Sequence, residues 1–206
     1  MSRSKSSSKW LKEHFDDPYV KQAQEAGYRS RAVFKLKEID DKDHLLKPGR
    51  SVVDLGAAPG GWAEYVRAKL PDKDPVFALD ILPMEPIAGV YIIQGDFTSE
   101  AVLNELIEAL DGAKINLVLS DMAPNISGMK AIDQPKAMYL AELALDFCQQ
   151  AMAPGGDFLV KVFQGEGFDD FLMAMRDRFQ KVLVRKPSAS RPRSREVYLL
   201  GRHYKA

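Results

Sequence analysis

The feature that most constrains the fold of this chain is a change of pattern at Ser51. From there on, short apolar runs alternate with longer amphipathic stretches, which is typical of strands that alternate with helices. The expected strands span 51–55, 76–79, 90–94, 115–120, 157–163, 181–185 and 196–201. The expected helices between them span 61–70, 99–110, 135–152 and 168–179. This alternation predicts an α/β fold with a mostly parallel, seven-stranded sheet that carries helices on both faces.

The connection between the last two expected strands is short. It comprises only residues 186–195, which is too short for the helical crossover that parallel neighbours require. The last strand is therefore predicted to be antiparallel to its neighbour.

The segment before the first strand is expected to be helical. Asp16 and Asp17 followed by Pro18 are typical of a helix start, and this helix should end near Gly27. Ser30 is placed to cap a second helix. A chain of 206 residues with 46% apolar and 28% charged residues fits one globular domain. We expect a single domain over 1–206, with a mobile basic arm at 1–15, N-terminal helices at 16–50 and a catalytic core at 51–206.

The sequence shows no sign of export or of a membrane span. Residues 1–9 lack the apolar stretch of a signal peptide, and no run approaches the roughly 18 apolar residues of a spanning helix. Cys148 is the single cysteine, which excludes an internal disulfide, and no Cys/His cluster has the spacing of a zinc site. We therefore expect a cytoplasmic protein without a metal.

The charges are unevenly distributed, although 29 Lys and Arg balance 29 Asp and Glu. Residues 1–50 hold 12 basic and 8 acidic groups, residues 51–175 hold 7 and 19, and residues 176–206 hold 10 and 2. Basic ends thus flank an acidic middle. This asymmetry indicates that both ends contact a polyanion, with solvated faces that happen to cluster as the alternative.

The first expected strand runs into a loop of small residues, Asp54 to Trp62. In an open parallel sheet, the crevice beyond the carboxyl ends of the strands is the usual ligand site. The glycines at 56, 60 and 61 do not have the spacing of a dinucleotide-binding loop. Asp54 would repel a pyrophosphate but suits a cationic ligand such as S-adenosylmethionine, which carries an ammonium and a sulfonium and no phosphate. The alternative is a tight turn with no ligand.

Two further acidic residues follow successive strands. Asp80 ends the second strand, where a carboxylate can accept hydrogen bonds from both hydroxyls of a ribose. Asp96 follows the third strand and is placed to accept from an adenine amino group. A lone aspartate after a strand is usually a cap or turn residue. Three acids after three successive strands favour a nucleoside site instead.

Lys161 lies inside an apolar strand that is expected to be central. A buried ammonium is costly unless it is paired, so this lysine requires a carboxylate partner. Asp121, at the end of the fourth strand, is the expected partner. The pair is either part of an active site or a structural ion pair.

Five ordered segments together resemble the FtsJ/RrmJ family of ribose 2'-O-methyltransferases. They are VFKL around Lys35, DLGAAPGGW from Asp54, SDMAPN from Ser120, VKVFQGEG from Val160 and SREVY from Ser194. The resemblance runs from about Ser7 to the end. It implies a Rossmann-like S-adenosylmethionine-dependent methyltransferase fold, and is strongest to the bacterial members that methylate a uridine of large-subunit (23S) ribosomal RNA and support ribosome biogenesis. The implied catalytic residues are Lys35, Asp121, Lys161 and Glu196, and the implied cofactor contacts are Gly60, Trp62, Asp80, Asp96 and Asp121.

The chemistry of such a reaction agrees with these residue types. Methyl transfer from a sulfonium to a ribose hydroxyl is a direct displacement, so the reacting atoms must be aligned and a proton removed. Lys161 is our choice for the central group. When neutral it accepts the proton, which Lys35 and desolvation favour; when charged it stabilises the developing alkoxide, which Asp121 and Glu196 favour. The sequence leaves both roles open.

The basic ends are expected to bind RNA backbone. The candidate cations are Lys9, Lys12, Arg29, Arg31, Lys37, Arg185, Lys186, Arg191, Arg193 and Arg195. Trp10, Phe15 and Tyr28 either stack on bases or belong to the core. The polar segment 187–195 is expected to be an exposed loop that leads to Glu196. The expected partner is large-subunit rRNA within a ribosomal particle, bound by a monomer.

Two alternatives of other kinds stay open at this point. One is a nicotinamide-dependent dehydrogenase, which the glycine spacing and Asp54 disfavour. The other is a non-catalytic RNA-binding or ribosome-assembly factor, which would not need Lys161. Relatives that act on tRNA or on mRNA caps share the four catalytic residues, so the substrate is the least constrained part of the hypothesis.

Overall fold

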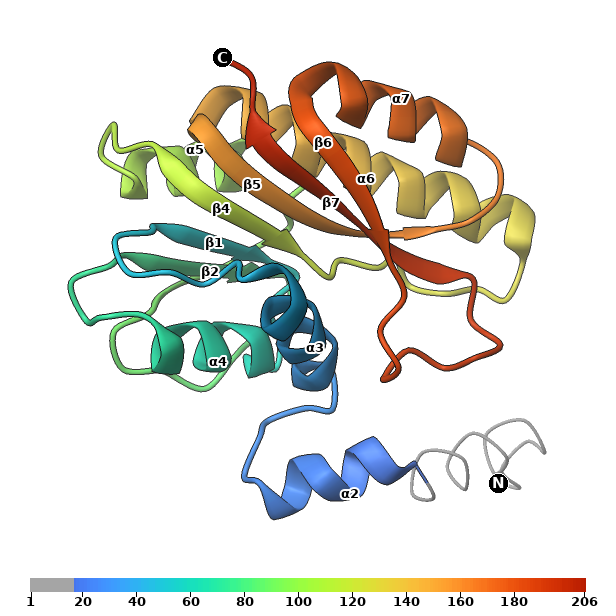
Figure 1. The fold of residues 1–206 in the computed structure, drawn as a ribbon, viewed down its shortest axis with the longest axis horizontal. Coiled ribbons are helices and arrows are strands. Elements are labelled where there is room, and N and C mark those ends of the chain that lie inside the picture. Colours follow the sequence, from blue (N-terminus) through green and yellow to red (C-terminus); the bar gives the residue numbers. More distant parts are fainter. Residues whose placement is uncertain (1–16) are drawn as a thin grey trace.

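The computed structural model describes residues 17–206 (Figure 1). The expected basic arm, with Lys9, Lys12, Trp10 and Phe15, lies outside the described residues. The helices are α2 Pro18–Glu25, α3 Val33–Asp43, α4 Gly61–Lys69, α5 Glu100–Ala109, α6 Lys130–Ala151 and α7 Phe168–Arg178. The strands are β1 Val52–Leu55, β2 Val76–Asp80, β3 Tyr91–Gln94, β4 Ile115–Ser120, β5 Met152–Phe163, β6 Phe179–Arg185 and β7 Glu196–Tyr204.

The seven strands form one sheet in the order β3-β2-β1-β4-β5-β7-β6. The first five strands in this order pair in parallel, and β7 pairs antiparallel with both β5 and β6. The predicted α/β class, the seven-stranded sheet and the antiparallel last strand are thus confirmed. The position of β7 between β5 and β6 was not part of the sequence prediction. A short connection fixes the direction of a strand relative to one neighbour but does not determine its second neighbour.

The boundaries that differ most from the sequence expectation are the starts of α6 and β5. Helix α6 begins at Lys130, so that Pro135 lies inside it rather than at its start. Asp133 accepts hydrogen bonds from the backbone of Ser127 and Gly128, which holds the preceding turn against the first turn of the helix. Strand β5 begins at Met152, before its glycines, because Met152 pairs with Ile115 of β4. Both differences arise from contacts that the local pattern does not show.

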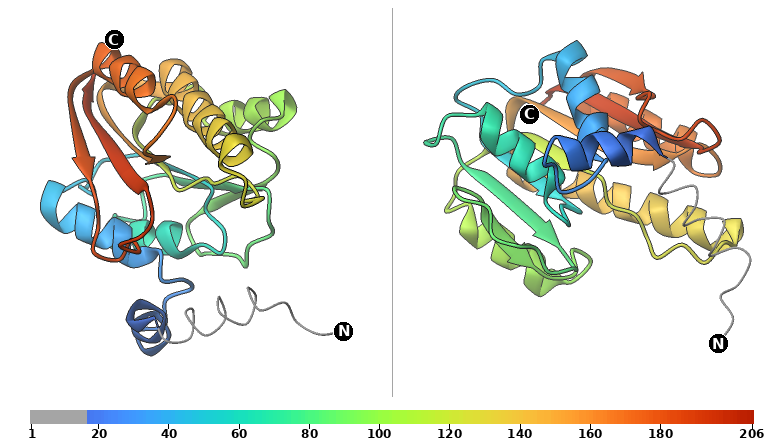
Figure 2. Two further views of the ribbon diagram at one scale, coloured as in Figure 1. Left: turned by 90° about the vertical axis from the view of Figure 1, so that its right-hand side faces the viewer. Right: turned by 90° about the horizontal axis from the view of Figure 1, so that it is seen from below.

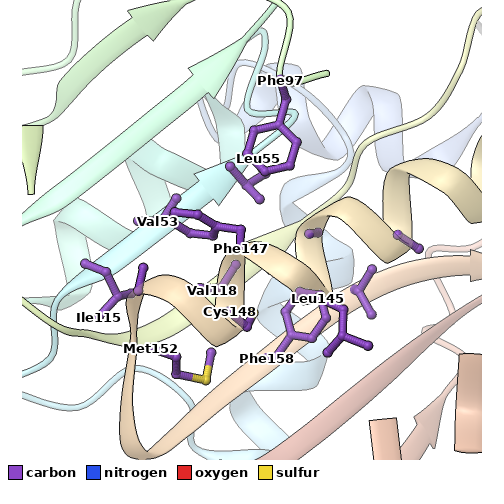
Figure 3. Packing of buried hydrophobic residues seen from close by; sticks show 14 of the residues in the cluster. Val53, Leu55, Phe97, Ile115, Val118, Leu145, Phe147, Cys148, Met152 and Phe158 are labelled. Atoms are coloured by element: carbon purple, nitrogen blue, oxygen red, sulfur yellow. The ribbon is translucent and has the colours of Figure 1, made fainter. Parts of the chain in front are cut away.

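Helices cover both faces of the sheet, as predicted (Figures 1 and 2). Helices α3 and α4 bury their apolar side chains on one face with Leu117, Leu119 and Leu159. Helices α5, α6 and α7 pack on the other face with Val118 and Phe158 (Figure 3). This division follows the strand period of two, which sends successive side chains to opposite faces. The face that carries α3 is the one on which the predicted catalytic residues Lys161 and Glu196 lie.

Two further observations concern the described part of the chain. Within residues 17–206, no helix is both long and apolar enough to cross a membrane. In the same range, no group of three or more His, Cys, Asp or Glu side chains is arranged to hold a metal ion.

Cys148 is buried on α6, and burial raises the pKa of its thiol well above its usual value, so it is an apolar core residue.

Candidate active site

A cavity of about 540 Å³ opens at the carboxyl ends of the parallel strands. Gly56 follows β1, Asp80 ends β2, Asp96 follows β3 and Asp121 follows β4, and all four line this cavity. Lys136 of α6 is the basic side chain that completes the lining. Three predicted site residues, Asp80, Asp96 and Asp121, are therefore brought together as expected from strand order.

The loop after β1 approaches the neighbouring strand end very closely. Gly56 has φ +77°, and a Cβ added there would lie 2.8 Å from Met122. Only glycine accommodates both this positive φ and this contact. The close approach lets backbone rather than side chain form this wall of the cavity.

The acidic side chains at the cavity are oriented by backbone amides. Asp80 accepts from the Ala58 amide at 2.8 Å and from the Leu82 amide at 2.8 Å. Asp96 accepts through Oδ1 from the amide of Thr98 at 2.9 Å and from its hydroxyl at 2.8 Å. A carboxylate has about four acceptor positions. Both therefore keep acceptor capacity for a ligand while their rotamers are held.

Gly60 and Trp62 are not among the residues that line the cavity. Gly60 is the N-cap of α4, and Trp62 is 3% exposed. Trp62 donates from Nε1 to the Ala32 carbonyl at 2.7 Å and packs on Tyr198. A cofactor contact by either residue would involve backbone groups, and this assignment stays a prediction.

Asp54 is placed differently from what its charge suggested. Its side chain is fully buried, does not line the cavity, and has no hydrogen-bond partner for either carboxyl oxygen. Burial, and then the nearby Asp121 and Asp80, raise the pKa of Asp54 well above its usual value. This environment favours the neutral form, so the expected attraction of a cation by Asp54 is not supported.

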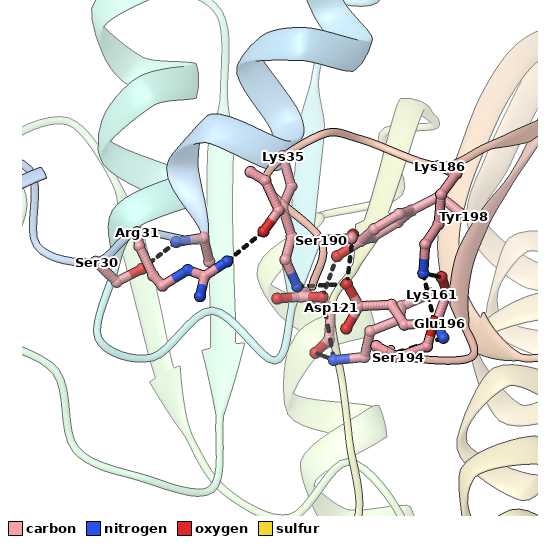
Figure 4. Close-up of polar contacts among 12 residues, drawn as sticks. Ser30, Arg31, Lys35, Asp121, Lys161, Lys186, Ser190, Ser194, Glu196 and Tyr198 are labelled. Atoms are coloured by element: carbon pink, nitrogen blue, oxygen red, sulfur yellow. Dashed lines mark hydrogen bonds and ion pairs between the residues drawn. The ribbon is translucent and has the colours of Figure 1, made fainter. Parts of the chain in front are cut away.

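The other predicted catalytic residues lie on the face of the sheet that carries α3. Lys161 follows Leu159 by two residues in β5, and Glu196 precedes Tyr198 by two residues in β7. Side chains two residues apart in a strand point to the same face, so all four share the face that carries α3. Lys35 comes from α3, which packs on the same face. The strand period thus explains why residues that are distant in sequence meet here (Figure 4).

The first of two ion pairs joins β5 to the end of β4. The Nζ of Lys161 lies 3.1 Å from Oδ1 of Asp121 and 2.6 Å from its carbonyl oxygen. Tyr198 donates its hydroxyl to the same Oδ1 at 2.7 Å. The side chain of Lys161 is 8% exposed and that of Asp121 is 18% exposed. Oδ2 of Asp121 is engaged by neither group.

The second ion pair joins α3 to the start of β7. The Nζ of Lys35 lies 2.7 Å from Oε1 of Glu196, and the Ser190 hydroxyl donates to the same oxygen at 2.7 Å. The Lys35 ammonium also lies 5.8 Å from the centre of the Tyr198 ring, close enough for a cation–π contact. Tyr198 therefore contacts both ion pairs and makes them one cluster.

The electrostatics of the cluster keep both carboxylates charged. Burial raises the pKa of Asp121, but Lys161 and Lys35 outweigh it and hold this pKa below its usual value. Burial likewise raises the pKa of Glu196, but Lys35, together with Ser190 and Lys161, outweighs burial and holds this pKa below its usual value. Burial and Asp121 raise the pKa of Tyr198 well above its usual value, so the phenol keeps the proton that it donates.

The model of the FtsJ-like methyltransferase family matches residues 28–204 of this chain. The chain belongs to the FtsJ-like methyltransferase family. It is 58% identical over 206 residues to a ribosomal RNA large subunit methyltransferase E of Hydrogenovibrio crunogenus, covering 100% of both chains. A protein of the same name from Alkalilimnicola ehrlichii is 61% identical over 198 residues, which are 96% of this chain and 95% of that one. The crystal structure of a ribosomal RNA methyltransferase from Plasmodium falciparum superposes with a TM-score of 0.78 at 31% identity, covering 86% of this chain and 98% of that one.

Two members of the cluster in this FtsJ-like methyltransferase were given no role by the sequence. Tyr198 directly faces Lys161 in the β5–β7 ladder, and Ser190 reaches Glu196 from the preceding loop. Alternation along the last strand would have placed Tyr198 on the side of Glu196. For Ser190 the sequence holds no such signal, because a loop has no period.

Several cations that were expected to contact phosphates are engaged within the protein. Arg29 donates to the carbonyls of Glu85 at 2.7 Å and Pro86 at 3.0 Å. Arg31 contacts Asp17 and the Ala189 carbonyl. Arg185 forms a two-pronged pair with Asp43 at 2.6 and 2.7 Å. These arginines hold elements together, and a role in RNA binding stays a prediction for them. Tyr28 packs edge-on against Phe34, as its core alternative predicted.

Proposed function

We propose that this FtsJ-like methyltransferase transfers a methyl group from S-adenosyl-L-methionine to the ribose 2'-hydroxyl of a uridine in large-subunit (23S) rRNA. The observation that carries the proposal is the cluster of two lysine–carboxylate pairs at the edge of an acidic cavity. Relatives that match the chain over its full length are named as large-subunit rRNA methyltransferases. Their names support the substrate class.

The cavity suits S-adenosylmethionine in size and charge. Its volume of about 540 Å³ lies in the range of small-molecule sites. Asp80 would accept from the ribose hydroxyls, Asp96 from the adenine amino group, and Asp121 through Oδ2 from the ammonium group. A pyrophosphate would face three carboxylates here, which disfavours a dinucleotide.

When bound, S-adenosylmethionine would supply an electrophilic methyl, and the transfer would break the carbon–sulfur bond, form a carbon–oxygen bond to the ribose and release the hydroxyl proton. The task of the protein is to hold the hydroxyl in line and to manage that proton. Lys161 donates to two oxygens of Asp121, an arrangement that fits an ammonium group. In that form it stabilises the developing negative charge on the 2'-oxygen. Proton acceptance by a neutral Lys161 is the alternative role.

The second pair would position the nucleotide. Lys35 is anchored by Glu196 and by the Tyr198 ring, so its ammonium is held at a defined place beside Lys161. A fixed cation there can orient a ribose or its phosphate. Arg191 and Arg193, in the loop that leads to Glu196, extend the positive charge outward. We further propose that the enzyme works as a cytoplasmic monomer on a ribosomal particle, in support of ribosome biogenesis.

The test uses RNA from a strain that lacks this gene. Purified protein and labelled S-adenosylmethionine are incubated separately with large ribosomal subunits, naked 23S rRNA and tRNA from that strain. A 2'-O-methyl blocks alkaline cleavage at its own nucleotide, so the modified position appears as a gap in a hydrolysis ladder. We expect one gap at a uridine of 23S rRNA. Methylation of tRNA alone would contradict the proposed substrate. If the wild-type protein transfers no methyl group to any of these RNAs, the proposed enzymatic activity is contradicted.

A further inference from the structure

The loop between β6 and β7 is less exposed than its composition suggests. Its sequence is polar, basic and broken by prolines, and residues 187–195 were expected to be exposed. In the structure, Ala189 is 1% exposed and Ser190 is 4% exposed. The prediction of an exposed loop is therefore wrong at the loop centre.

Contacts from α3, from the turn that precedes α3 and from the ends of the loop itself hold the loop centre in place. Arg31 donates to the Ala189 carbonyl, and Glu38 accepts from the Ser188 amide at 2.8 Å. Lys186 donates to the Ser194 carbonyl at 2.7 Å and to the Glu196 carbonyl, which closes the base of the loop. The loop is thus held at defined points against the helix that carries Lys35.

This arrangement aims one buried hydroxyl at the active site. Ser190 donates to Oε1 of Glu196, the oxygen that also receives Lys35. Two donors on one oxygen fix the rotation of the carboxylate, and Oε2 is engaged by neither donor. A hydrogen bond to a charged group is also stronger than one between neutral groups.

We propose that Ser190 is a positioning residue for methyl transfer, which holds the Glu196 carboxylate against Lys35 in the orientation that the reaction needs. The inference rests on the proposed function. It assigns Ser190 no contact with substrate, since its hydroxyl acts through Glu196. The groups that face Glu196 are Lys35 from α3, Lys161 from β5, Tyr198 from β7, and Lys186 and Ser190 from the loop.

The test compares Ser190→Ala with Ser190→Thr, which keeps the hydroxyl, and with Ser188→Ala. Ser188 is a matched control, because its hydroxyl lies in the same loop but contacts exposed Glu38 at 3.3 Å. Single-turnover transfer is measured across pH on unmodified large subunits at saturating S-adenosylmethionine. We expect Ser190→Ala to lose about tenfold in rate, the effect of one hydrogen bond to a charged group. RNA and cofactor affinity should stay within about twofold.

The pH profile separates positioning from a structural role. The Ser190 hydroxyl helps to keep the pKa of Glu196 below its usual value, against burial and together with Lys35. Its removal should therefore move the acid limb of the rate profile to higher pH, and Ser190→Thr should restore it. Ser188→Ala should match the wild type throughout.

Each outcome decides a different point. An active wild type with an unchanged rate in Ser190→Ala overturns the positioning role alone. A loss of stability and RNA affinity with an unmoved pH profile also overturns it, because a loop support would behave in that way. An inactive wild type overturns the proposed function and the positioning role with it. If Ser190→Ala does not fold, Ser190→Cys keeps the volume with a weaker donor and should show the same shift in the profile.

Discussion

Lys161 and Tyr198 directly face each other across the β5–β7 ladder, and both contact Oδ1 of Asp121. The Lys161 Nζ lies 3.1 Å from this oxygen, and the Tyr198 hydroxyl donates to it at 2.7 Å. The ladder therefore sets the separation of the two donors, and Asp121, at the end of β4, accepts from both of them. A shift of β7 by one residue in this register would send Tyr198 to the other face of the sheet, away from Lys161 and Asp121. The active-site geometry is thus a consequence of strand pairing.

Lys161→Ala should lose about 10²-fold or more in turnover, the usual contribution of a proton-transfer or charge-stabilising group. Cofactor affinity should change little, since Lys161 does not line the cavity. Single-turnover assays on the RNA substrate at saturating S-adenosylmethionine measure the first effect, and calorimetry measures the second. A wild-type rate in this variant would make the lysine half of a structural ion pair.

Lys161→Arg separates the two roles of the lysine. It keeps a positive charge beside Asp121 but does not release a proton at ordinary pH. Substantial residual activity would favour charge stabilisation, and near-complete loss with intact cofactor binding would favour proton abstraction. The unfolding transition of this variant controls for misfit of the larger side chain.

Asp80→Ala should weaken S-adenosylmethionine binding by about 2 kcal/mol, roughly thirtyfold, because two ribose hydroxyls lose their acceptor. The same change frees the amides of Ala58 and Leu82, so stability should fall as well. Calorimetry and thermal unfolding are measured together. Asp72→Ala, an exposed acid between α4 and β2, serves as the control and should change neither. Unaltered binding in Asp80→Ala would remove Asp80 from the site.

RNA affinity should fall steeply with salt, because each phosphate contact releases counterions. In the double variant Arg191→Ala and Arg193→Ala, the slope of log affinity against log salt should flatten by about one unit per lost contact. Lys73→Ala, an exposed lysine between α4 and β2, should leave the slope unchanged. Equal slopes for the wild type and the double variant would show that this loop does not bind RNA backbone.

The pH dependence of stability should change in Asp54→Asn. The pKa of Asp54 is raised in the folded state above its unfolded value of about 3.9, so the folded protein holds the extra proton between these values. This group therefore makes the free energy of unfolding fall as pH rises above about 4. Asn cannot titrate. Relative to the wild type, the variant should gain stability as pH rises, as measured by urea unfolding at a series of pH values.

The acid side of the same measurement is an internal control. The pKa values of Asp121 and Glu196 are lowered in the folded state, so their contribution is present above the unfolded values and is lost as pH falls through the folded ones. Both proteins should share this loss below about pH 4. Parallel curves at all pH values would contradict the raised pKa of Asp54.

Much of the architecture was predictable because it depends on local pattern. Strand and helix periods differ, so the order of elements and the parallel core were found from sequence, with boundary errors where Met152 pairs with Ile115. The convergence of Asp80, Asp96 and Asp121 was also predictable, because parallel strands end at one edge of the sheet. Lys161 and Asp121 were paired from the cost of a buried ammonium, whereas Lys35 and Glu196 came from the family resemblance, and the structure brings all four together.

The sequence by itself determined the class of the fold and the acidic edge of the sheet, because periodicity and the residues that follow each strand are local properties. Only the tertiary structure decided that β7 lies beside β5, which brings the Tyr198 hydroxyl within hydrogen-bond distance of Asp121. It also buried Asp54 away from the cavity and turned Ser190 inward to Glu196. These outcomes depend on strand register and on contacts between distant segments. Such contacts are set by packing of the whole chain, which no local pattern records.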